Sequence, residues 1–412
     1  MVRDKYGRKM SKSLGNVVDP LEIINGCTLD DLFKKLESGN LPEKEIAKAK
    51  KGQQMDFPKG IPECGADALR FGLLAYTQQG RDINLDINRL VGYRNFCNKL
   101  WNAIRFAMTN LEGGFTAAEN VAETLLSNPV VSLRDRYILS RLNYAITTCN
   151  QSFEAYDFGE LTNALYNFWL YDLCDVYLEL TKPVMTGDDE NAKLTAQQTL
   201  YVCLEYGLRL LHPIMPFVTE ELWQRLPGKR STPSITIAPY PLPVAAWSNP
   251  EVEANMELVK DVIHAARSVR AEYNLVNSVR PQFFIKCSDA EVKNVVEAQL
   301  DDFSTLAKAG ESKCLVDEEP PKGCAMHSVN EKVQIHVLLA GLVDFANEIS
   351  KLEKKLTKIQ PSIDSLQKKI SKEDYETKVP ENVRETEATK LDALQKEKEG
   401  IENAIAGFQR LL

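Results

Sequence analysis

The sequence predicts a mainly α-helical protein, and three patterns along its 412 residues lead to that expectation. Apolar residues recur at helical spacing from about residue 86 to residue 273, which predicts an antiparallel helix bundle. Strand-like segments gather between 281 and 340 and predict a small α/β unit. Near the C-terminal end, apolar residues alternate in steps of three and four, which predicts a coiled-coil hairpin. The expected parts are residues 1–85, 86–275, 276–340 and 341–412.

Composition and cysteine usage exclude several classes of protein. The chain has a formal net charge of −8 and 44% hydrophobic residues, which is ordinary for a globular protein. No apolar run approaches the roughly 18 residues of a membrane-spanning helix, and the first residues given do not form the hydrophobic segment expected of a secretory signal. The nine cysteines are odd in number and none forms a Cys-x-x-Cys pair. This argues against a disulfide framework and against a zinc or other metal site, and it predicts free thiols in a cytoplasmic setting without membrane contact.

A polar loop near the start of the chain is the strongest candidate for a functional site. Lys9, Ser11, Lys12 and Ser13 lie in the run Gly7–Asn16, with glycines on both sides. Positive charge on such a loop suits a clamp for polyphosphate, because fixed charge stabilises the charge that develops in phosphoryl or nucleotidyl transfer. A solvated basic loop in front of a helix is the alternative.

The segment that follows this loop alternates short helices with polar sequence. Asp19 followed by Pro20 predicts a helix start, and Asp67 begins a second short helix. Residues 37–62 are rich in lysine, glycine and proline, which predicts an inserted surface excursion.

The predicted bundle carries aromatic clusters and ends in a polar helix segment. We interpret the aromatic clusters as core and not as platforms for stacked bases. Near the end, Arg267 and Arg270 share one helix face at i and i+3 and are candidate contacts to phosphates. Salt bridges with Glu272 or nearby acids are the alternative. The α/β unit is then predicted from strands at 282–287, 313–317, 324–329 and 332–338, with helix at 289–308.

The C-terminal hairpin consists of two apolar seams joined by a polar turn near 373–385. Pro361 lies inside the first arm and predicts a kink there. The lysines of this arm are candidate contacts to RNA, whereas a solvated outer face, a protein partner or a scaffold are the alternatives. These residues are Lys351, Lys354, Lys355, Lys358, Lys368, Lys369 and Lys372.

The run Lys9-Met-Ser-Lys-Ser13 resembles the second signature loop of class I aminoacyl-tRNA synthetases. The resemblance implies that the loop holds the triphosphate of ATP, with its Mg²⁺, while an amino acid is activated. It assigns Lys12 the main contact to the leaving pyrophosphate, supported by Lys9, Ser11 and Ser13. The first part of the chain is then expected to be a remnant of the class I catalytic fold.

Further runs resemble valyl-tRNA synthetases in particular. These runs are residues 80–86, 92–102 and 375–385, together with Asp67–Phe71, which resembles the stem-contact region and makes Arg70 a candidate backbone anchor. The resemblance implies an anticodon-binding bundle and a coiled-coil arm that contacts tRNA-Val, in a C-terminal portion of a cytosolic-type enzyme that uses ATP and valine. An isoleucyl-tRNA synthetase is the alternative.

One signature of the family is not found in the sequence. Class I enzymes need a His-x-Gly-His motif, and none of the four histidines, at 212, 264, 327 and 336, has this spacing. We therefore expect that the chain alone does not activate an amino acid. A non-catalytic tRNA-binding module and a scaffold that uses only the coiled coil are the other hypotheses.

Overall fold

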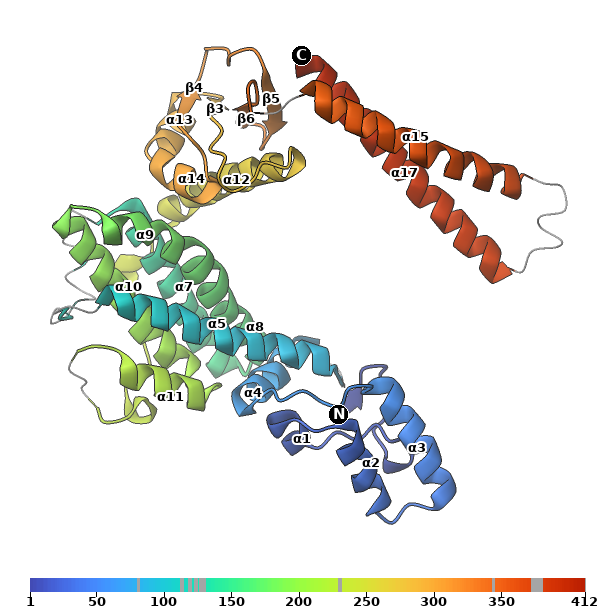
Figure 1. Cartoon of the computed structure of the whole chain (residues 1–412). Helices are drawn as coiled ribbons and strands as arrows, with labels where there is room; N and C mark the ends of the chain where they lie inside the picture. Colours follow the sequence, from blue (N-terminus) through green and yellow to red (C-terminus); the bar gives the residue numbers. More distant parts are fainter. Residues whose placement is uncertain are drawn as a thin grey trace. The chain divides into compact units, whose positions relative to one another are not determined.

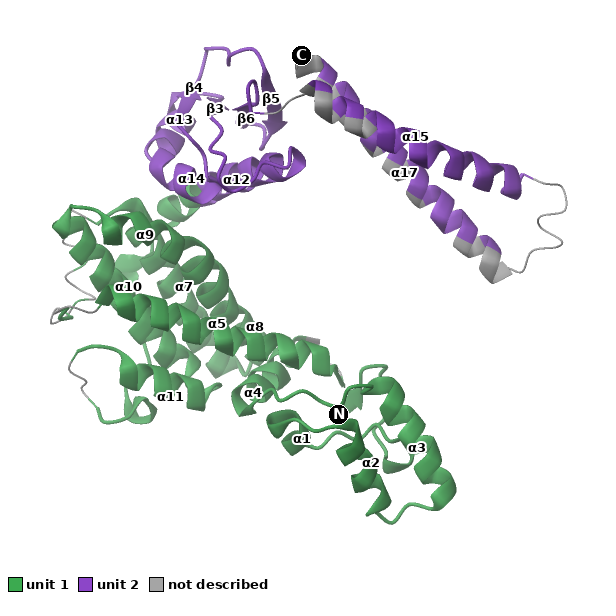
Figure 2. Cartoon of the chain, viewed as in Figure 1, with its two compact units in different colours: residues 1–256 green, residues 257–412 purple. Residues whose placement is uncertain are grey.

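The computed structural model describes residues 1–79, 82–111, 115–117, 121, 125, 131–228, 232–342, 345–371 and 381–411. The chain is mainly helical, as the sequence predicts (Figure 1). It divides into two compact units, residues 1–256 and 257–412 (Figure 2). This division falls inside helix α12, Pro250–Glu272, ahead of the boundary at 275 that the sequence predicts. Gly80, Arg81, Lys372 and residues 375–380 of the predicted turn motif lie outside the described residues.

The first unit begins with a module of short elements around a two-stranded parallel sheet. Capping boxes start two of its helices, because Asp19 and Thr28 each accept from a backbone amide of the first turn. The elements of this module are β1 (Val2–Asp4), the 3-10 turn η1 (Lys12–Leu14), α1 (Pro20–Asn25), α2 (Leu29–Glu37), α3 (Glu43–Asp56), α4 (Ala66–Ala75), η2 (Tyr76–Gln79) and β2 (Ile83–Leu85).

Residues 37–62 are largely exposed, as the predicted surface excursion requires, but the sequence did not predict a helix in them. Most of this stretch forms helix α3, which packs against the 3-10 turn η1. Ala49 and Gln53 on its inner side are buried, whereas most other positions of the helix are exposed. The helix therefore contributes to the module through a few small or polar residues, which its lysine-rich sequence does not reveal.

A bundle of long helices follows and contains the largest apolar core of the chain. At its centre, Trp169 is fully buried and donates to the carbonyl oxygen of Gly207 at 3.3 Å. A Cβ at position 207 would lie 2.8 Å from the Trp169 ring, so only glycine allows this contact. The bundle elements are α5 (Ile87–Leu111), α7 (Leu133–Ala155), α8 (Phe158–Asn167), the π-helix η3 (Phe168–Tyr177), α9 (Leu178–Thr186), α10 (Glu190–Leu211), α11 (Pro216–Arg225), η4 (Ile235–Ile237) and η5 (Ala245–Trp247).

Helix α4 of the module is joined to the bundle at the turn between α10 and α11. The Arg70 guanidinium donates to the carbonyl oxygens of Pro213 at 3.0 Å and Ile214 at 2.8 Å. These bonds satisfy carbonyl groups of a turn that a proline interrupts. Arg70 thus has a structural role in this joint, and a structural role is the interpretation that the sequence favours over a contact to RNA.

The same joint caps the next helix from outside. Helix α11 begins at Pro216 and has no capping side chain of its own. The Asp67 carboxylate of α4 accepts instead from the amides of Phe217 at 3.3 Å and Val218 at 2.7 Å. Burial raises the pKa of Asp67, although the two amide bonds act in the opposite direction. Asp67 and Arg70 therefore fix the module to the bundle by hydrogen bonds to backbone groups.

The second unit contains a four-stranded sheet in the order β4-β3-β6-β5. Strands β3 and β4 are parallel and the other neighbours are antiparallel, with Ile285 of β3 opposite Cys314 of β4 and Ile335 of β6. The strands lie where the sequence predicts them, whereas the predicted helix at 289–308 is two helices. The elements are β3 (Phe283–Cys287), α13 (Ala290–Glu297), α14 (Leu300–Ala307), β4 (Ser312–Leu315), β5 (Cys324–Ser328) and β6 (Val333–Leu338).

Two long helices, α15 (Phe345–Ile370) and α17 (Glu381–Leu411), pack side by side as the predicted hairpin (Figure 1). Ile349, Ile363 and Ile401 are buried at the seam. Pro361 lies inside α15, which continues past it. This hairpin is called the arm below.

The joint predicts that Asp67 contributes to the stability of the folded chain. The variant Asp67→Ala leaves the first amides of α11 without their acceptor and should lower the free energy of unfolding by about 1–2 kcal/mol. Chemical denaturation measures this change, and amide hydrogen exchange should accelerate at Phe217 and Val218. The control Asp175→Ala removes an exposed ion pair to Lys99 and should cost less than about 1 kcal/mol. Equal losses in the two variants would contradict the capping role.

Candidate functional site

The lysine loop, residues 7–16, is held at its start by a tight turn after β1. The amide of Asp4 donates to the carbonyl oxygen of Arg8 at 3.1 Å, and the amide of Gly7 donates to that of Asp4 at 2.9 Å. Gly7 has a φ of 77°, a conformation that glycine adopts without strain. The turn places Lys9 opposite Arg3 in a single antiparallel bridge. The loop therefore leaves the small sheet in a defined direction.

Asn16 closes the root of the loop. Its side-chain oxygen accepts from the amide of Ser11 at 2.9 Å, and its side-chain nitrogen donates to the Asp4 carboxylate at 2.9 Å and to the Lys9 carbonyl at 3.3 Å. Both Asn16 and Asp4 are buried. Burial alone would raise the pKa of Asp4, but hydrogen bonds from Asn16 and Arg8 outweigh it, so this pKa lies below its ordinary value. The loop ends are thus fixed from within, and sequence reasoning gave Asn16 no role.

Helix α3 supports the loop by direct contact between backbones. Gly15 has a φ of 67°, and a Cβ there would lie 2.4 Å from the carbonyl oxygen of Ala49. A Cβ on Gly52 would lie 2.7 Å from the carbonyl oxygen of Leu14. Side chains at these two glycines would push the helix away from η1. The close approach fixes the C-terminal end of the loop.

The functional side chains of the loop remain available to a ligand. Lys9 and Lys12 are exposed and form no ion pair with a described residue, whereas the Ser11 and Ser13 hydroxyl oxygens lie 3.4 Å apart. The structure thus brings all four predicted residues onto one loop. Two uncompensated ammonium groups with neighbouring hydroxyls suit phosphate oxygens, which accept from both kinds of donor.

The other basic residues near the loop are neutralised by acids. Arg8 pairs with Asp4 at 2.6 Å and with Asp56 at 3.3 Å, and Lys5 pairs with Asp56 at 3.4 Å. Arg3 pairs with Asp82 at 2.5 Å. The positive charge that the loop offers a ligand is therefore concentrated on its two signature lysines.

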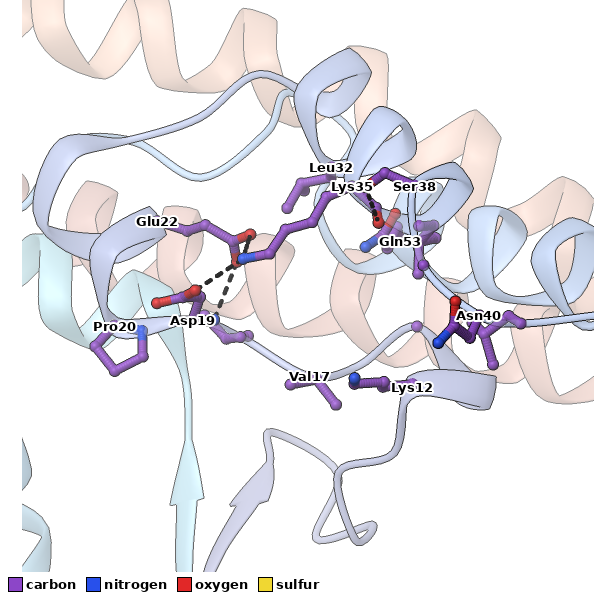
Figure 3. A pocket seen from close by; sticks show the side chains of 15 residues that line it. Lys12, Val17, Asp19, Pro20, Glu22, Leu32, Lys35, Ser38, Asn40 and Gln53 are labelled. Carbon is purple, nitrogen blue, oxygen red and sulfur yellow. Dashed lines mark hydrogen bonds and ion pairs between the residues drawn. The ribbon is translucent and has the colours of Figure 1, made fainter.

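A pocket of about 690 Å³ lies between the end of the loop, α1, α2 and α3 (Figure 3). Lys12 lines it, and on its far wall the Lys35 ammonium lies 2.8 Å from both Asp19 and Glu22. The hydrogen bond from Lys35 holds the pKa of Asp19 below its ordinary value. Sequence reasoning missed this group, because Asp19 and Glu22 belong to the start of α1 whereas Lys35 belongs to α2, and only the fold brings the two helices together.

The two predicted arginine contacts of α12 have different surroundings from those expected. Arg270 is buried, and its guanidinium donates to the carbonyl oxygens of Val279, Lys308 and Val276 at 2.9, 2.9 and 3.0 Å. It therefore does not fit the role of a phosphate contact, and its partners are carbonyls and not the acids of the alternative. Arg267 is exposed and donates to the carbonyl oxygen of Leu306 at 2.8 Å. The Arg267 guanidinium has further N–H donors, so its predicted contact to a phosphate stays a prediction.

The predicted lysine contacts of the arm lie along α15. Lys354, Lys355, Lys358, Lys368 and Lys369 are exposed, and Lys369 forms an ion pair with Glu387 of α17. Lys351 also lies on α15, and Lys372 lies outside the described residues.

The described residues offer neither a metal site nor a membrane-spanning helix. Among the described ranges, no group of three or more His, Cys, Asp or Glu side chains is placed to hold a metal ion. None of the helices in the described part of the chain is long and apolar enough to span a membrane.

Comparison with known protein families matches three segments of the chain. Residues 1–86 match the class I tRNA synthetases for isoleucine, leucine, methionine and valine, and residues 135–283 match the anticodon-binding domain of tRNA ligase. Residues 344–409 match the tRNA-binding arm of valyl-tRNA synthetase. The segments follow the module, the bundle and the arm in that order.

The curated relatives are valine–tRNA ligases, and the similarity extends over the whole chain. The mouse protein is 49% identical over 100% of this chain and 32% of its own length, and the human protein is 48% identical over the same shares. Mitochondrial valine–tRNA ligase 1 of Arabidopsis thaliana is 43% identical over 98% of this chain and 37% of its own. The chain thus spans about a third of the length of these relatives. It belongs to the valyl-tRNA synthetase family, and it contains the parts of that family that carry the lysine loop, the anticodon-binding bundle and the tRNA-binding arm.

Proposed function

We propose that this chain provides the nucleotide-binding loop and the RNA-binding parts of a valine–tRNA ligase. The observation that carries the proposal is the order of the three matched segments, which is accompanied by a loop whose two lysines face no acid. In the reaction, ATP activates valine and the acyl group then passes to the terminal ribose of tRNA-Val. The names of the relatives favour valine over isoleucine.

In this proposal the lysine loop stabilises the departure of pyrophosphate. The valine carboxylate attacks the α-phosphorus in line, and negative charge moves onto the β- and γ-phosphates. Lys12 and Lys9 supply fixed positive charge where it develops, and Ser11 and Ser13 supply hydroxyl donors. Mg²⁺ would arrive on the nucleotide, because the Asp4 carboxylate beneath the loop is already occupied by Asn16 and Arg8. Asn16 and Asp4 act as positioning residues that hold the loop.

For the chain alone we propose tRNA binding without amino-acid activation. The four histidines lack the His-x-Gly-His spacing that the activation site of the class requires. A cytoplasmic location belongs to the same proposal and is supported by nine cysteines that are all free thiols. Protein partners bound through the arm are a second candidate role, since coiled coils commonly serve that purpose.

The proposal is tested by equilibrium binding of the purified chain to valine tRNA and to isoleucine tRNA across a salt series. Selective binding to valine tRNA is the expected result. Equal and weak binding to both tRNAs, lost as salt rises, would show only non-specific attraction and would contradict the recognition role.

The clamp role of the loop predicts a selective effect of Lys12→Ala. In a valine–tRNA ligase that contains this segment, the variant should slow valine-dependent pyrophosphate exchange by about 10²–10³-fold, the range found when one transition-state donor is removed. Its affinity for tRNA should stay unchanged. The control Lys34→Ala removes an exposed lysine of α2 and should alter neither measurement. A Lys12→Ala variant with a parallel loss of tRNA affinity would argue against the clamp.

The RNA-binding role of the arm predicts a change in salt dependence. Replacing Lys354, Lys355, Lys358 and Lys368 with Ala should weaken tRNA binding. The slope of log affinity against log salt should fall by about 0.9 for each duplex phosphate contact that is lost. A control with Lys34, Lys44, Lys48 and Lys51 of α2 and α3 replaced carries the same change in net charge and should keep the slope. If both variants keep the slope, these lysines of the arm do not contact the phosphates of tRNA.

A further inference from the structure

A second pocket, of about 360 Å³, lies in the first unit between α4, α5 and α8. Its size suits a small organic group. Part of its wall comes from residues 89–93, which lie between the segments 1–86 and 135–283 that match known families. The residues that line it are Phe71, Ala75, Arg89, Gly92, Tyr93, Thr162, Asn163 and Tyr166.

One wall of the pocket is a row of aromatic rings that leads from the core to the surface. Phe71 is buried and its ring centroid lies 5.0 Å from that of Tyr93. Tyr93 and Tyr166 meet edge to face at 6.4 Å, and Tyr166 meets Tyr171 in the same way at 6.1 Å. Tyr171 is 51% exposed. The neighbouring Phe168 and Trp169 belong to the buried core, whereas Tyr166 is half-buried and packs against that core.

Gly92 leaves part of the pocket wall open. A glycine inside a helix such as α5 lowers stability relative to alanine, and it usually has a packing or backbone reason. Neither reason applies here: a Cβ at position 92 would meet no atom within 4 Å, and Gly92 is not among the described residues with a positive φ. At Gly72 of α4, in contrast, a Cβ would lie 2.3 Å from the Leu90 side chain. The effect of Gly92 is to keep the pocket free of a side chain.

Polar groups stand at the rim of this aromatic pocket. The Arg89 guanidinium lies over the Tyr76 ring at 4.5 Å and donates to the Tyr93 hydroxyl at 3.4 Å, which leaves further donors of the same group available. Asn163 is exposed, and its side chain has no hydrogen-bond partner among the described residues. The pocket thus combines a stacking surface, an amide with donors and acceptors, and a fixed cation.

We propose that this pocket binds one unpaired nucleotide of an RNA. The base stacks on one of the rings of Tyr93 and Tyr166 and meets the edge of the other, because the two rings stand at 89° to each other. The Asn163 amide pairs with the polar edge of the base, and Arg89 contacts a phosphate of the same strand. Aromatic side chains bind unstacked bases in single-stranded RNA because every base has a π-face, and an amide adds selectivity at the edge. The inference rests on the proposed function, since it takes tRNA as the source of the nucleotide.

The test fills the pocket without removing a contact. The variant Gly92→Leu places a side chain in open space and favours the helix, so the melting temperature should be equal or higher. Its affinity for valine tRNA should fall at least about fivefold, which is the lower limit for loss of one stacked base. Unchanged affinity for valine tRNA in a folded Gly92→Leu variant would contradict nucleotide binding in this pocket.

Ring variants test the same site independently of its glycine. Tyr166→Ala should weaken tRNA binding by about five- to a hundredfold, whereas Tyr166→Phe keeps the ring and should stay within about twofold. The control Tyr144→Ala removes an exposed tyrosine of α7 outside the pocket and should keep full affinity. Equal losses in Tyr144→Ala and Tyr166→Ala would contradict a specific site. Photo-crosslinking of 4-thiouridine-substituted tRNA should label Tyr93 or Tyr166 and not Tyr144.

Three further outcomes separate this proposal from binding of a free nucleotide and from the proposed function. Tight binding of free AMP that Gly92→Leu abolishes, with tRNA affinity unaffected, would replace RNA by a free nucleotide and overturn the proposal. If all pocket variants bind tRNA as tightly as the wild-type chain does, nucleotide binding in the pocket is contradicted but the proposed function is not. If the wild-type chain binds no tRNA, the proposed function is contradicted as well.

Discussion

The first unit depends on the joint between α4 and the turn that starts α11. Asp67 and Arg70 lie three residues apart on one helical face, so a single turn of α4 presents an acceptor and a donor together. They bind amides and carbonyls that the break at Pro213 and Pro216 leaves without helical partners. Because the contacts are made to backbone groups, the joint needs no matching side chains from the bundle. It holds the lysine loop and the bundle within one compact unit.

The positive charge that the loop offers a ligand is what remains after nearby acids have paired with the other basic residues. The N-terminal segment is strongly basic, yet Asp4, Asp56 and Asp82 take up the arginines and one lysine around the loop. Among the described arginines and lysines of this segment, Lys9 and Lys12 alone form no ion pair, so their positive charge is available to a ligand. This explains how a chain of net charge −8 presents a site suited to polyphosphate. The acids also shape the loop, because Asp4 orients Asn16, and Asn16 binds the backbone of the signature at Lys9 and Ser11.

Features that repeat along the sequence could be predicted, and features that depend on remote partners could not. The seam of the arm, the strands of the α/β unit and the helical bundle follow from periodicity alone. Helix α3 was missed because its stabilising contacts are made to η1, some 35 residues earlier in the chain, and its exposed face reads as a polar excursion. Arg270 was misjudged for the same reason, since the three carbonyls that bury it come from segments that follow its helix. Lys9 and Lys12 were found because their motif is contiguous.

The contact between α3 and the loop also determines how freely this helix can change. Its register is set where two backbones touch, at Ala49 and Gly52, and not by interlocking side chains. Most of its other positions face solvent and carry no contact that the loop requires. A library of substitutions across residues 43–56 would therefore be permissive at the exposed positions, intolerant of bulk at Ala49 and Gly52, and sensitive at Asp56, which pairs with Arg8 and Lys5. In mutational terms, the support of the lysine loop depends on positions where side chains are small or missing.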